Sequence, residues 1–162
     1  MKCFSLCLAA LAAAVTLTSI AAAGPDAAKQ RVAISMKDLD HGTFVLTPLQ
    51  VGPLKRDSGT VSLVESDEPV VMRNGQTVGI FRNMYSFKGK RGSFTVRERM
   101  EFVEVSNEKA PGSEFRPGVG MGTWKFAGGT GRYARIAGGG RSAMAGLWPR
   151  WLARQEGYVT LP

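Results

Sequence analysis

The fold of this chain is decided by residues 93–105, which read SFTVRERMEFVEV. Apolar and polar residues alternate there with a period of two, which is typical of a β-strand with one buried face. The even positions include Phe94, Val96 and Phe102, whereas the odd positions are mostly charged or hydroxylated. The even face is therefore expected to point inward, and it carries Glu98 into an apolar environment.

The same alternation recurs on both sides of this stretch, and no amphipathic helix of ordinary length appears. The 20 glycines also disfavour helices, because glycine is costly in a helix interior. Strands are expected near 32–36, 44–46, 60–65, 77–87, 93–105, 119–127, in the glycine-rich run to 146, and at 156–161. The Asn74-Gly75 pair is typical of a hairpin turn. Eight or so strands without long helices predict an antiparallel barrel or sandwich.

The first 23 residues have the three parts of a secretory signal peptide. Lys2 supplies the charged start, residues 4–20 are uncharged and apolar, and Ala21 and Ala23 place small residues where signal peptidase reads them. The apolar run is only just long enough to span a bilayer and no basic stop follows it. Cleavage after residue 23 and export to the periplasm or the medium are therefore expected.

Removal of this segment would leave residues 24–162 as a single domain without a transmembrane segment. Cys3 and Cys7 would leave with it, so the remaining chain has no disulfide and no thiolate metal site. His41 is the single histidine, which argues against a histidine-ligated metal or a Ser-His catalytic site. We expect no metal and no cofactor.

The basic excess of the chain is confined to one block. Residues 24–114 are nearly balanced, whereas residues 115–155 contain basic residues and no acid. One interpretation is an anionic partner, such as an envelope component or a carboxylate ligand; the other is ordinary surface charge. Nucleic acid is disfavoured by export and by the absence of an aromatic-plus-basic RNA motif.

Glu98 on the inward face should have a raised pKa unless it is paired. Two interpretations are open: a cross-strand Arg, Tyr or Asn (or a wet barrel mouth) satisfies it, or it contacts a ligand or transfers a proton.

In residues 77–87 both faces are partly apolar, and the face with Phe81, Asn83, Tyr85 and Phe87 is taken as inward because aromatic side chains fill a barrel. The other face, with Val78, Ile80 and Met84, would lie outside, under a loop or a neighbouring subunit of a homo-oligomer.

Residues 124–133 read WKFAGGTGRY and invite comparison with phosphate-binding loops. Too few residues follow for a second β-α unit, and no Gly-Lys-Ser/Thr is present, so a Rossmann domain and a P-loop are excluded. Gly129 and Gly131 are instead expected to have positive φ or to pack too closely for a Cβ.

The pattern Trp124-x-Phe126-x-Gly128-Gly129-Thr130-Gly131-x-Tyr133-x-x-Ile136-x-Gly138-x-Gly140 resembles a segment of dirigent proteins and their bacterial relatives. These share an eight-stranded barrel with plant allene oxide cyclases, so the resemblance implies a closed antiparallel eight-stranded barrel of the calycin type. It covers about residues 119–146, with a topological similarity over 42–106. Residues 155–162 also resemble a closing strand of exported bacterial relatives. Because the shared residues are mostly structural, the resemblance implies the fold and not an activity.

Trp148-Pro149-Arg150-Trp151 has two interpretations. It is either an aromatic platform for a sugar or a lipid, or a rim loop whose tryptophans plug one end of the barrel. The second is preferred.

The leading hypothesis is a small exported barrel that binds an apolar or amphipathic molecule in its interior. Its candidate ligand-binding residues are Phe81, Asn83, Tyr85, Glu98, Met100 and Trp124. The alternatives are a cyclase or isomerase acting on an oxylipin-like substrate, with Glu98 as acid/base and Asn83 or Tyr85 as its electrostatic partner, and a non-catalytic protein whose basic face meets the cell envelope. A continuous interior cavity would favour the first two, and a filled interior the third.

Overall fold

A computed structural model of the chain describes residues 29–39, 41–73, 76–106, 108–109, 116–147 and 150–161. The expected signal peptide, the Asn74-Gly75 turn and Trp148-Pro149 lie outside the described residues. No helix in the described part of the chain is both long and apolar enough to cross a membrane.

Nearly all of the described residues lie in strands. The elements are β1 (Gln30–Lys37), β2 (Gly42–Pro48), β3 (Asp57–Asp67), β4 (Val70–Arg73), β5 (Gln76–Gly89), β6 (Gly92–Glu104), β7 (Gly118–Gly129), a 3-10 helix η1 (Gly131–Tyr133), β8 (Ala137–Leu147) and β9 (Arg150–Thr160).

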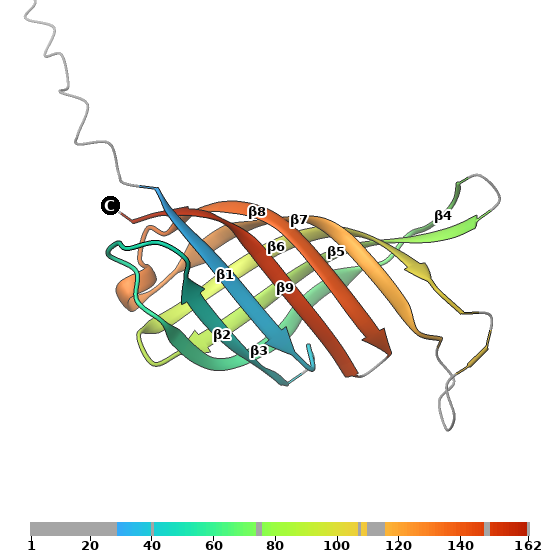
Figure 1. Cartoon of the computed structure of the whole chain (residues 1–162), viewed down its shortest axis with the longest axis horizontal. Coiled ribbons are helices and arrows are strands. Elements are labelled where there is room, and N and C mark those ends of the chain that lie inside the picture. Colours follow the sequence, from blue (N-terminus) through green and yellow to red (C-terminus); the bar gives the residue numbers. More distant parts are fainter. Residues whose placement is uncertain are drawn as a thin grey trace, which may run out of the picture.

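These strands form a closed antiparallel barrel of eight strands with one extra strand, which confirms the predicted fold class. The order is β3-β2-β1-β9-β8-β7-β6-β5-β4, and a further pairing of β3 with β5 closes the ring. The extra strand is β4, which pairs with the first residues of β5 and extends beyond the barrel wall (Figure 1).

The inward faces of β5 and β6 are those predicted from the alternation. Phe94, Val96, Glu98 and Met100 of β6 are buried, as are Asn83, Tyr85 and Phe87 of β5. Val78 and Ile80 lie on the opposite face of β5 but are also buried, whereas Met84 on that face is partly exposed.

Two boundaries differ from expectation. β3 begins at Asp57, three residues before the strand expected at 60–65, and β9 begins at Arg150, six residues before the strand expected at 156–161. The inward face of β9 carries Ala153 and Gln155, which are too small or too polar to produce an alternating pattern. Trp151 is therefore a buried strand residue and not part of a rim loop.

One end of the barrel is filled by aromatic side chains. Phe87 and Phe94 stack with ring centroids 4.6 Å apart, and Tyr133 from η1 packs on Phe94 at 4.8 Å. The Tyr133 hydroxyl donates a hydrogen bond of 2.7 Å to buried Asp57. Figure 1 shows η1 at the end of the barrel away from β4.

The glycine-rich segment positions Tyr133, as its predicted structural role requires. Gly131 has φ +58, and a Cβ there would lie 2.7 Å from the carbonyl oxygen of Arg91. A Cβ on Gly129 would meet the carbonyl oxygen of Tyr133. Positive φ is therefore confirmed for Gly131, and close packing is confirmed for both glycines.

Candidate functional site

A pocket of about 300 Å³ opens at the end of the barrel opposite η1. Its lining is mostly apolar, and the polar groups are Asn83 and Tyr85 on the inner wall with charged side chains at the rim. The lining residues are Leu39, Leu63, Glu68, Phe81, Asn83, Tyr85, Phe102, Glu104, Arg116, Met144 and Trp151. The interior is thus hollow at one end and filled at the other, and not a continuous cavity.

The polar wall of the pocket is a short hydrogen-bonded chain. The Asn83 amide donates to the Tyr85 hydroxyl at 2.8 Å, and the Ser66 hydroxyl lies 2.7 Å from Asn83 Oδ1 and 2.9 Å from Glu68 Oε1. Burial raises the pKa of Tyr85, and the nearby carboxyl groups of Glu98 and Glu68 raise it further. Tyr85 therefore remains a neutral phenol at any physiological pH.

The Tyr85 hydroxyl accepts the Asn83 hydrogen bond, and its own proton has no acceptor among the described residues. A phenol can donate one hydrogen bond and accept others at the same time. The pocket therefore combines an apolar surface with one available, positioned donor.

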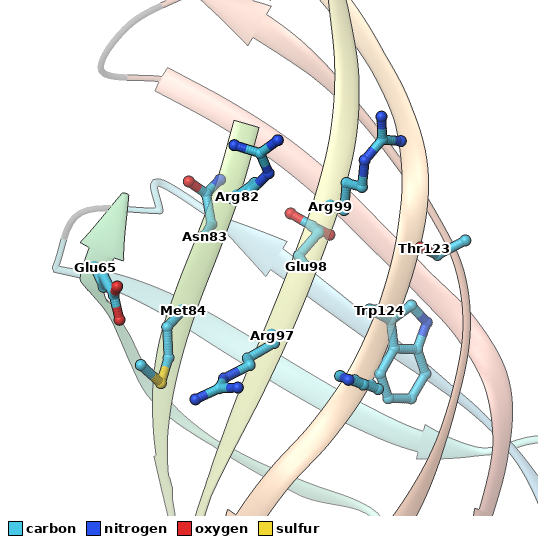
Figure 2. A pocket seen from close by; sticks show the side chains of 10 residues that line it. Glu65, Arg82, Asn83, Met84, Arg97, Glu98, Arg99, Thr123 and Trp124 are labelled. Carbon is cyan, nitrogen blue, oxygen red and sulfur yellow. The ribbon is translucent and has the colours of Figure 1, made fainter. Parts of the chain in front are cut away.

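Glu98 lies deeper in the barrel, on β6 between Asn83 of β5 and Trp124 of β7 (Figure 2). Its side chain is buried and accepts a hydrogen bond of 2.9 Å from the Gln155 amide of β9. β6 and β9 are not neighbours in the sheet, so this contact reaches across the interior.

The environment of Glu98 favours the neutral carboxylic acid. Burial raises its pKa, and the polar groups of Gln155 and Ser142 lower it only in part. The Ser142 hydroxyl and Gln155 Oε1 are themselves buried without a good hydrogen-bond partner. A protonated Glu98 could donate to one of them, whereas a carboxylate could not.

The structure thus divides the six candidate residues into two groups. Phe81, Asn83 and Tyr85 line this pocket, whereas Glu98, Met100 and Trp124 do not. Asn83, Glu98 and Trp124 are among the residues that line a second hollow, of about 560 Å³, over β5, β6 and β7 (Figure 2). Met100 is fully buried, and the Trp124 indole donates to the backbone oxygens of Arg141 at 3.0 Å and Glu156 at 3.3 Å.

Sequence reasoning missed several lining residues. Leu39, Leu63, Met144 and Trp151 are ordinary apolar residues on separate elements, and only Trp151 stands in an unusual motif. No sequence pattern marks Gln155 and Ser142 as partners of Glu98, because that role depends on which strands face each other across the barrel.

Comparisons of the chain with models of protein families, with curated proteins and with solved structures find no match. The resemblance to dirigent proteins and allene oxide cyclases is therefore supported only as far as the eight-stranded barrel itself. Within the described ranges, no three or more His, Cys, Asp or Glu side chains form a group that could hold a metal ion.

Replacing Glu98 by glutamine should stabilise the protein at neutral pH, because glutamine keeps the shape and cannot ionise. The raised pKa of Glu98 means that the folded state retains a proton that the unfolded chain releases above about pH 4.3. The free energy of unfolding of the wild type should therefore fall relative to that of Glu98→Gln as the pH rises from about 4.3 towards the raised pKa of Glu98 in the folded state. The slope should reach at most about 1.4 kcal/mol per pH unit. Urea denaturation at pH 4, 6 and 8 measures the difference.

Exposed Glu65 provides a matched control for this measurement. Glu65→Gln makes the same chemical change at an exposed position and should change stability only slightly. Loss of stability in Glu98→Gln at pH 8 would mean that Glu98 is an ionised, stabilised carboxylate, contrary to this description.

Proposed function

We propose that the chain is an exported β-barrel protein that binds a small amphipathic molecule at the open end of its barrel. The observation that carries this proposal is the apolar pocket with the unpaired Tyr85 donor on its wall. Pockets for small molecules combine an apolar surface with a few placed polar groups in this way.

The pocket volume restricts the size of the molecule. About 300 Å³ is the lower end of the range for small-molecule pockets. Phe81, Phe102 and Trp151 supply flat walls, with Phe102 edge-on to both Phe81 and Trp151 at 5.5 and 5.4 Å. These features suit one ring system or a short acyl chain that carries a hydrogen-bond acceptor for Tyr85.

Binding is favoured over acid/base catalysis by the position of Glu98. A catalytic carboxyl group must reach the proton that it moves. Glu98 does not line the pocket at the open end, and its carboxyl group accepts the hydrogen bond from the Gln155 amide. The polar side chains of Gln155 and Ser142 explain how the Glu98 carboxyl group is accommodated in the barrel interior without a catalytic role.

Native mass spectrometry of the protein purified from its own host tests both parts of the proposal. A retained molecule should appear as a mass increment, and the mass of the polypeptide should correspond to a chain that begins at Gly24. A polypeptide that retains residues 1–23 would contradict export with cleavage.

Filling the pocket should abolish binding of an amphipathic probe. With 1-anilinonaphthalene-8-sulfonate as the probe, Leu63→Trp should reduce affinity by tenfold or more, because the indole occupies the apolar space. Tyr85→Phe should reduce it by about threefold to tenfold through loss of one hydrogen bond. The probe's fluorescence titration measures both effects.

Val51→Trp is the matched control, because Val51 is fully exposed and lies outside the pocket. It adds the same indole without filling the pocket and should leave affinity unchanged. Equal affinity of Leu63→Trp and wild type would place the probe elsewhere and contradict the proposed site.

A further inference from the structure

The outer face of the barrel wall from β6 to β9 carries an apolar row beside the open end. Strand register places Val103, Val119, Ala145 and Leu152 side by side on four successive strands. Val119 is 40% exposed and Leu152 is 63% exposed.

In the neighbouring row, Met121 beside Ala143 is 72% exposed. A contiguous row of exposed aliphatic side chains is unusual on a protein that is surrounded only by water.

Basic rows follow on the same face, farther from the open end. Arg99, Thr123 and Arg141 are in register across β6, β7 and β8, and Arg97 pairs with Lys125 in the next row. Two shallow hollows, of about 560 and 820 Å³, share Arg99 and Thr123. The larger one also extends over Val119 and Met121 and includes the carboxylates of Glu101 and Glu156. Figure 2 shows the first, with Arg82, Arg97 and Arg99 around it and Glu65 at its edge.

Most of the acids on this face are already engaged. Asp67 pairs with Arg82 at 2.8 Å, Glu101 with Arg99 at 3.5 Å, and Glu156 with Arg154 at 2.7 Å and Arg31 at 3.3 Å.

Arg97, Lys125 and Arg141, in contrast, have no ion-pair or hydrogen-bond partner for their charged groups within the described part of the chain. The face therefore presents unneutralised positive charge next to an apolar edge.

We propose that this outer face docks on the surface of a bilayer that contains anionic lipids. Proteins that lie on a membrane combine apolar side chains that enter the headgroup boundary with cations that attract anionic lipids. At about 3.3 Å per strand residue, the basic rows lie about 13 Å and about 20 Å from the apolar row along the strands. Insertion of the apolar row brings these cations to the charged surface.

A soluble polyanion and a second copy of the chain fit this face less well. A polyanion would contact the basic rows but would leave Val119, Met121 and Leu152 in water. A symmetric dimer through this face would place the same patch on both sides of its two-fold axis. If that axis passed through the basic rows, Arg97, Lys125 and Arg141 would lie opposite their own copies, and like charges repel.

The apolar row also borders the mouth of the pocket. Trp151 and Phe102 line the pocket. The next residue on each strand, Leu152 or Val103, lies on the outer face in the apolar row. Docking through this row would place the mouth next to the bilayer. The position of the mouth matters only for the proposed ligand binding, and the docking does not depend on that binding.

Co-sedimentation with vesicles tests the docking. The purified protein should bind vesicles of phosphatidylcholine mixed with phosphatidylglycerol and should bind pure phosphatidylcholine much more weakly. The variant Arg97→Gln/Lys125→Gln/Arg141→Gln should bind the anionic vesicles about a hundredfold more weakly at low salt. High salt should remove most of this difference, because it screens the charges.

The apolar contribution needs its own variant. Met121→Ser/Leu152→Ser should weaken binding about tenfold at every salt concentration, since apolar burial is not screened. The control Lys88→Gln/Lys90→Gln/Arg132→Gln removes the same charge from exposed residues at the closed end and should bind nearly as wild type. Thermal melting of each variant shows that it is folded.

Three results would overturn the proposal. The first is no preference for anionic vesicles. The second is equal binding to a soluble acidic polysaccharide together with an unaffected apolar variant, which would identify a polyanion site. The third is a dimer in analytical ultracentrifugation that Met121→Ser/Leu152→Ser dissociates, which would identify the face as a self-interface.

Discussion

Asp57→Ala should lower the free energy of unfolding by about 3–5 kcal/mol, because it removes a buried carboxylate and leaves the groups that donate hydrogen bonds to it without an acceptor. Asp57 accepts four hydrogen bonds, from the Tyr133 hydroxyl and from the backbone amides of Ser58, Lys90 and Arg91. These bonds join β3, the turn after β5 and η1. Urea denaturation of the variant at pH 7 measures the loss.

Asp67, on the same strand, is the control for this change. Its ion pair with Arg82 is exposed on both sides, so Asp67→Ala should cost at most about 1 kcal/mol. Similar losses in the two variants would mean that the closed end does not depend on Asp57.

The same carboxylate should contribute to acid unfolding. Burial alone would raise the pKa of Asp57, but the hydrogen bonds from Tyr133 and from the three backbone amides together lower it below the ordinary value. Its stabilisation is therefore complete above about pH 3.9, the unfolded value, and is lost as the pH falls through the lower folded pKa. Asp57→Ala should lack this part of the acid transition.

Gly131→Val should cost about 3 kcal/mol or more, or prevent folding altogether. The backbone at Gly131 has φ +58, which a β-branched residue strongly disfavours, and the added side chain would press on the Arg91 carbonyl oxygen. Displacement of the loop would also withdraw Tyr133 from the barrel end. Thermal and urea denaturation of the variant measure the effect.

Gly131→Asn separates the two causes. Asparagine tolerates the left-handed region better than valine, so this variant should lose less stability. Unchanged stability of Gly131→Val would show that the turn has no need of glycine.

The strands that the sequence predicted best are those whose inner face is mostly apolar and bulky. Residues 93–105 alternate so regularly that their inward face follows from the sequence, and the paired β5 could be assigned from its aromatic residues. The first half of β9 could not be predicted from the sequence, because Ala153, Gln155 and Gly157 on its inner face do not form an apolar alternating pattern. Ala153 and Gly157 are small and Gln155 is polar, so none of the three adds a bulky apolar position to the pattern.

The site was predictable only where it lies along one strand. Phe81, Asn83 and Tyr85 alternate on β5, so recognition of one inward residue identified the others. The contact between Glu98 and Gln155 joins residues 57 positions apart on strands that are not neighbours. It depends on the stagger of the closed barrel, which strand patterns do not specify.

The position of β1 between β2 and β9 has a consequence for how the chain folds. The hairpins β5–β6, β6–β7 and β8–β9 are local and can form early, but the wall closes only when residues 30–37 meet residues 150–160. Such distant pairings give a high contact order and correspondingly slow folding, in milliseconds to seconds. A nascent chain that still lacks β9 would be an open sheet with β1 and β8 as unpaired edges, which are templates for aggregation.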